Sequence, residues 1–139
     1  EPQYKPSHTT TSGISSSDTL MIPVMILPVD DASRETKWLT PLAQSANGTL
    51  EVPDANGRID VITDYYAFKV ERMDKWREGI GQASQYGSET GKIPCLALIV
   101  DSDLWPLNKE TIEKLRVVER TTLEQGIKLV VLRREPPKR

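Results

Sequence analysis

The sequence predicts one α/β domain, a mixed sheet flanked by helices, with its elements in the order α-β-β-β-α-β-α-β. Two observations predict this class. Three short segments of alternating hydrophobicity follow one another between residues 49 and 71, which is typical of an antiparallel meander. After them, helical patterns alternate with short apolar runs, and β-α-β units of this kind form parallel strands covered by helices. The length of 139 residues fits a single domain, which we place at residues 20–135.

The N-terminal third begins with an expected flexible tail over residues 1–19, because nine of these residues are Ser or Thr and few can be buried. Leu20 to Val29 is apolar and contains two prolines, which favour an edge strand. Ala32 to Asn47 is predicted as a helix that Ser33 caps. Pro41 argues against one continuous helix and favours two shorter turns.

The meander is predicted to consist of Thr49–Pro53, Arg58–Thr63 and Tyr66–Glu71, with Asp54 to Gly57 as the first turn. In the third strand, side chains alternate between two faces. One face carries Tyr66, Phe68 and Val70, and the other carries Ala67, Lys69 and Glu71.

Two helices and two strands complete the expected domain. Asp74 is the predicted cap of a helix over Lys75–Ser88. Leu96–Val100 is continuously apolar, as a buried central strand is. Asn108 caps a helix that extends to Gln125, and Gly126 suits the position after its end. Ile127–Leu132 is the last strand, and residues 136–139 form a basic C-terminal end.

Composition excludes several function classes. One cysteine, Cys95, rules out an internal disulfide framework and a cysteine-rich zinc site. The only histidine, His8, lies in the expected tail, which argues against histidine-based catalysis. The net charge of −2 argues against a tight, non-specific nucleic-acid binder. We expect a soluble protein of undetermined compartment with no membrane partner, because the longest apolar stretch is short and broken by prolines. The chain begins with Glu1, which leaves a processed N-terminus open.

One group of charged residues could carry chemistry. Asp60 lies on one predicted strand of the meander, while Lys69 and Glu71 share one face of the next. Carboxylates on adjacent strands can hold a hard cation such as Mg²⁺, and a lysine beside them can stabilise charge on a phosphate. The spacing alone is weak evidence, because charged residues on one face of a strand are usually its solvated side.

Several motifs resemble the PD-(D/E)xK restriction-endonuclease-like superfamily. They are R-I-D-V-I-T at Arg58–Thr63, A-F-K-V-E at Ala67–Glu71 and K-W-R-E-G-I-G-Q-A at Lys75–Ala83. The similarity covers roughly residues 33–132, and the order of the elements matches that fold's core. The third motif is fairly specific, whereas an E-x-K tripeptide alone would be weak.

The resemblance implies a site for Mg²⁺ or Mn²⁺. Asp60 matches the first metal-binding aspartate, and Gln82 matches a glutamine that in this superfamily often faces the active site. Glu35 corresponds, more weakly, to the glutamate of the first helix, and Glu51 is a further nearby carboxylate.

The chain departs from the family at the central tripeptide. Where the family has E-x-K or E-x-D, this chain has Lys69-Val70-Glu71. In one interpretation the pair is exchanged: Glu71 binds the metal together with Asp60, and Lys69 or Lys75 supplies the positive group. In the other, the Lys69 ammonium occupies the metal position and the site is inactive.

The leading expectation is therefore a metal-dependent nuclease that hydrolyses phosphodiester bonds in nucleic acid, with DNA favoured. Asp60 and Glu71, with Glu51 or Glu35, would hold Mg²⁺, and the expected catalytic residues are Lys69, Lys75 and Gln82. The alternative is an inactive domain of the same fold that binds nucleic acid or protein, and a third possibility is a plain interaction domain. A homodimer is left open.

Overall fold

The protein is an α/β domain with a mixed sheet and helices on both faces, as the sequence predicts. The computed structural model describes residues 9–10, 21–54, 57–100 and 105–135. The sheet has the strand order β1-β2-β7-β6-β5-β4-β3. The pairs β2–β7, β7–β6 and β6–β5 are parallel, whereas β4 is antiparallel to both β5 and β3. The strands are β1 (Thr9–Thr10), β2 (Val24–Leu27), β3 (Thr49–Asp54), β4 (Gly57–Ile62), β5 (Tyr66–Arg72), β6 (Ile93–Ile99) and β7 (Lys128–Arg134).

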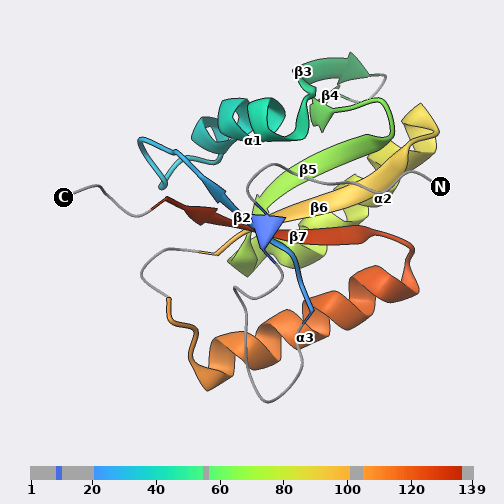
Figure 1. The fold of residues 1–139 in the computed structure, drawn as a ribbon. Coiled ribbons are helices and arrows are strands. Elements are labelled where there is room, and N and C mark those ends of the chain that lie inside the picture. Colours follow the sequence, from blue (N-terminus) through green and yellow to red (C-terminus); the bar gives the residue numbers. More distant parts are fainter. Residues whose placement is uncertain (1–8, 11–20, 55–56, 101–104, 136–139) are drawn as a thin grey trace.

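Each face of the sheet has its own apolar core. Figure 1 shows α1 (Leu39–Ala46) over one face and α3 (Lys109–Glu124) over the other. Trp38, Leu42 and Phe68 belong to the cluster beneath α1. Ile80 from α2 (Trp76–Thr90) and Leu115 from α3 belong to the second cluster, so α2 and α3 cover the same face. Burial of these apolar side chains is the main favourable contribution to folding.

The first helical segment consists of two parts, as Pro41 suggested. A 3-10 turn, η1 (Glu35–Trp38), precedes α1. Pro41 is tolerated because it lies in the first turn of α1, where the backbone N–H groups have no partner within the helix. The predicted cap was wrong: Ser33 donates its N–H and hydroxyl to Asp31 Oδ1, and no side chain caps η1.

The second helix begins differently from the prediction as well. Asp74 is not its cap but lies inside a 3-10 turn, η2 (Met73–Lys75), and Lys75 occupies the N-cap position without a side-chain bond. The Asn108 cap of α3 is confirmed, because its Oδ1 accepts from the Thr111 N–H at 2.8 Å. The expected tail contains the two-residue strand β1, which pairs with β2. Residues 1–8, 11–20 and 136–139 lie outside the described part of the structure.

Helix α2 lies so close to the sheet that two of its positions require glycine. A Cβ on Gly87 would lie 2.9 Å from Pro94 Cδ, and one on Gly79 would lie 3.1 Å from Glu71 Cβ. Gly81, in contrast, faces open space, and a Cβ there would meet nothing within 4 Å. Because Gly79 has no side chain, the Glu71 side chain fits between α2 and β5.

We expect Gly87→Ala to destabilise the protein by about 1–2 kcal/mol. The rigid Pro94 ring cannot yield to the new methyl group, and this overpacking outweighs the roughly 0.5–1 kcal/mol that alanine gains over glycine in a helix. Gly81→Ala is the matched control and should stabilise the protein by that smaller amount. Urea unfolding measures both, and equal effects of the same sign would contradict the close approach.

Candidate functional site

The predicted site residues gather where β4 meets β5. Val61 pairs with Phe68 across the two strands, and one further step along the antiparallel pair places Asp60 opposite Lys69. Lys69 and Glu71 alternate with Phe68 and Val70, which point into the core beneath α1. Both charged side chains therefore lie on the face covered by α2, as the alternation predicts.

Asp60 is held by a backbone group and by a lysine. Its Oδ2 accepts from the Val70 N–H at 2.8 Å and lies 3.5 Å from Lys69 Nζ. The side chains of Lys69 and Asp60 are only 13% and 19% exposed. Burial raises the pKa of Asp60, while the Val70 N–H and Lys69 act in the opposite direction. Asp60 thus holds the backbone of β5 and the Lys69 ammonium in place.

The Glu71 carboxylate is almost completely buried, because the residue is only 5% exposed. Its Oε1 accepts from the Arg72 N–H at 3.0 Å, and its Cβ and Cγ lie against the space that Gly79 leaves open. Because an isolated buried carboxylate is costly, Glu71 needs partners beyond one backbone N–H.

Glu35 supplies such a partner from η1. Burial, the hydrogen bond between the two carboxyl groups and the negative charge of Glu71 raise the pKa of Glu35, and Lys69 and Lys75 oppose this. Two carboxyl groups can hydrogen bond to each other only when one carries a proton, so folding favours the protonated form of Glu35. We call these two residues the carboxyl pair.

Arg72 fastens the chain before η1 to the end of β5. Its guanidinium donates to the carbonyl oxygen of Ala32 at 3.0 Å and to that of Ser33. This contact positions η1, and with it Glu35, beside β5. Sequence reasoning missed Arg72, because nothing in the local pattern indicates a partner 39 or 40 residues away.

The other predicted residues have mixed placements. Lys75 is exposed at the start of α2, and its charge acts on Glu35. Gln82 is exposed on α2, seven residues and about two helical turns after Lys75. Glu51 lies in β3, and its side chain is outside the described part of the structure. Cys95 is buried, and burial raises the pKa of its thiol, which makes it a core residue.

The residues that the structure describes do not fit the Mg²⁺ site that the resemblance implies. Within that part of the chain, no group of three or more His, Cys, Asp and Glu side chains is arranged to hold an ion. Asp60, the expected first ligand, faces the Lys69 ammonium, while Glu71 hydrogen bonds to Glu35. The expected ligands Asp60 and Glu71 thus take part in two separate interactions and do not converge on one ion position.

Comparison of the chain with protein-family models, with curated proteins and with solved structures found no match.

Across the described ranges, no helix has both the length and the apolar character needed to cross a bilayer. The expectation of a homodimer stays a prediction.

The carboxyl pair predicts a pH-dependent stability. Because the pKa of Glu35 is raised in the folded protein, folding favours its protonated form, and stability falls as the pH rises from about 4.5 through the raised pKa. Glu35→Gln removes this penalty and keeps a hydrogen-bond donor for Glu71. At pH 7.5 the variant should therefore unfold at a higher temperature than the wild type, with a smaller difference at pH 4.

Thermal unfolding between pH 4 and pH 8 tests this expectation, with Glu78→Gln as the control for an exposed glutamate on α2. A wild-type-minus-variant difference that does not change with pH would show that folding does not raise the pKa of Glu35. The raised pKa of Asp60 acts in the same direction but is present in both proteins, so it cancels in the difference.

Proposed function

We propose that this chain is a restriction-endonuclease-like domain that binds nucleic acid, with DNA favoured, and does not hydrolyse it. The order of the elements supports the fold assignment. Between residues 39 and 99 the chain runs α1-β3-β4-β5-α2-β6, with β3, β4 and β5 antiparallel and β6 parallel to β5. The motifs that resemble the superfamily lie on β4, β5 and the start of α2, which are the elements that form the candidate site.

The position of the Lys69 ammonium is the observation that carries the functional proposal. It lies 3.5 Å from Asp60 Oδ2, close enough to repel a divalent ion bound to this carboxylate. At a separation of 4 Å and an effective dielectric constant of 20, a divalent ion is repelled by an ammonium by about 8 kcal/mol. Lys69 therefore disfavours Mg²⁺ at Asp60 and supplies a fixed positive charge in its place.

The same positive charge suits a phosphate group. The charges of Lys69 and Lys75 both act on Glu35, so both ammonium groups contribute positive potential at that carboxyl group. Arg34 and Lys37 are exposed on the segment that carries Glu35. The raised pKa of Glu35 favours its neutral form, which lowers the repulsion of a phosphate by the carboxyl pair. A phosphodiester backbone can bind here without a metal ion, and no bound metal activates water for hydrolysis.

Fluorescence anisotropy with labelled single-stranded and duplex DNA in EDTA tests this proposal. We expect binding that weakens with salt, and Lys69→Ala should reduce affinity at least fivefold and lower the salt slope by about one. Lys128→Ala is the matched control, an exposed lysine at the start of β7. If no DNA or RNA binds in a salt-dependent way, or if the two variants behave alike, the proposal fails and a plain interaction domain is favoured.

A second candidate function, metal-dependent phosphodiester hydrolysis, is favoured by the carboxyl pair. Mg²⁺ is commonly held by one or two carboxylates, and an ion could take the place of the proton that the raised pKa of Glu35 favours. Calorimetry with Mg²⁺ and Mn²⁺, together with cleavage of supercoiled plasmid, tests this candidate. Binding that is lost in Glu35→Gln, accompanied by cleavage, would replace the first proposal with this one.

A further inference from the structure

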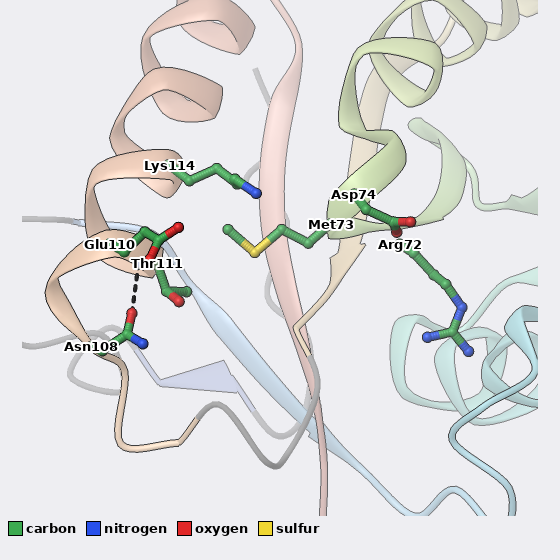
Figure 2. Close-up of a pocket in the computed structure, with 7 residues that line it drawn as sticks. All are labelled: Arg72, Met73, Asp74, Asn108, Glu110, Thr111 and Lys114. Atoms are coloured by element: carbon green, nitrogen blue, oxygen red, sulfur yellow. Dashed lines mark hydrogen bonds between the residues drawn. The ribbon is translucent and has the colours of Figure 1, made fainter.

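A pocket of about 380 Å³ lies beside the candidate site, between η2 and the start of α3. It opens where β5 ends and where α3 begins after β6, at the carboxyl ends of parallel strands, where open α/β sheets commonly bind ligands. Its volume is within the range of small-ligand sites. Its walls are formed by Met73 and Asp74 on one side, and by Asn108, Glu110, Thr111 and Lys114 on the other (Figure 2).

The pocket offers no excess of positive charge to a phosphate group. Asp74 and Glu110 place a carboxylate on each wall, and Lys114 contributes one ammonium. Arg72 also borders the pocket, and Figure 2 shows its guanidinium pointing away from α3. That guanidinium donates to the carbonyl oxygens of Ala32 and Ser33. The lining thus carries two carboxylates and two cationic groups, and the carboxylates can accept hydrogen bonds from an amino-bearing group.

The remaining surface suits a flat ring. Met73 points across the pocket toward Lys114 (Figure 2), and a thioether packs well against aromatic rings. The Oδ1 of Asn108 is occupied by the Thr111 N–H, so its amide nitrogen is the group that can donate to a ligand. The two carboxylates accept hydrogen bonds from amino groups, as Asp and Glu do from the cytosine amino group.

We propose that this pocket holds an unpaired nucleobase bearing an exocyclic amino group, from a strand whose phosphates lie at Lys69 and Lys75. This inference rests on the proposed function and names the part of the nucleic acid that the site recognises. Asp74 of the pocket and Lys75 of the phosphate site are consecutive residues, with Cα atoms about 3.8 Å apart. A base beside Asp74 and a phosphate near Lys75 can therefore belong to one nucleotide.

Oligonucleotides that differ only at the base edge test the proposal. Anisotropy at pH 8 should show that labelled oligo-dC binds about tenfold more tightly than oligo-dU, because cytosine has an amino group at C4 and an unprotonated N3, where uracil has a carbonyl and an N–H. The double variant Asp74→Asn with Glu110→Gln should reduce this preference to twofold or less. Glu113→Gln is the matched control, an exposed glutamate on the same helix, and should leave it unchanged.

Free nucleosides separate this inference from the proposed function, because they carry no phosphate. With the Met73 methyl group followed by NMR, deoxycytidine should shift its resonance and deoxyuridine should not. If oligonucleotides fail to bind but this shift is seen, the base pocket is supported and the proposed function fails. If oligonucleotides bind through Lys69 with equal affinity for dC and dU, or if Glu113→Gln abolishes the preference, the base pocket is overturned.

Discussion

Exchanging the two charged residues of β5, as Lys69→Glu together with Glu71→Lys, is expected to create Mg²⁺ binding that the wild type lacks. The exchange removes the ammonium beside Asp60 and places a second carboxylate there. Even a third of the roughly 8 kcal/mol repulsion between an ammonium and a divalent ion would strengthen binding about 100-fold. The new lysine at position 71 would face Glu35 and form an ion pair with its carboxylate.

Calorimetry with Mg²⁺ and Mn²⁺ measures the binding, and cleavage of supercoiled plasmid measures any activity that accompanies it. Lys69→Glu alone should bind the metal without cleavage, because it gains the carboxylate but lacks a lysine at position 71. Glu71→Lys alone should do neither. If the wild type already binds Mg²⁺ as tightly as the double variant, the Lys69 ammonium does not govern the metal position and the nuclease hypothesis gains support.

Asp60→Ala is expected to destabilise the fold by about 2–3 kcal/mol. The substitution leaves the Val70 N–H without its acceptor and the largely buried Lys69 ammonium without its counter-charge. A buried donor without a partner costs about 1–3 kcal/mol, and an unpaired charge adds to this. The midpoint of urea unfolding should fall by roughly 1–2 M.

Asp60→Asn is the control that separates these two contributions. The asparagine oxygen can still accept from the Val70 N–H, so only the interaction with Lys69 is weakened, and the loss should be less than half of that in Asp60→Ala. Equal losses in both variants would show that the charge of Asp60, rather than its hydrogen bond to β5, stabilises this part of the sheet.

The composition of the candidate site could be predicted in part from sequence. Strand alternation placed Lys69 and Glu71 on one face, and the antiparallel meander placed Asp60 on the neighbouring strand. The resemblance added Glu35, which the structure brings into hydrogen-bond contact with Glu71. The exchanged order of lysine and glutamate was visible as well, but its chemical consequence was not.

The periodicity of apolar residues in the sequence determined the helices and strands. Buried side chains recur at every second residue in a strand and about every 3.6 residues in a helix. The meander, the Asn108 cap and the buried strand β6 all follow from this local information. Tertiary structure alone decided which charged groups meet. Arg72, for example, holds the chain before η1 at the end of β5 through a carbonyl oxygen 40 residues away.

The pairing of Lys69 with Asp60, and of Glu35 with Glu71, depends in the same way on contacts between separate elements. The pocket between η2 and α3 is formed by residues more than 30 positions apart. Such contacts are set by how the elements pack, and hydrogen bonds and charges respond to differences of a few tenths of an ångström that hydrophobic patterning does not encode. The sequence therefore determined which charged residues this face of the sheet carries, and only the packing decided which of them pair.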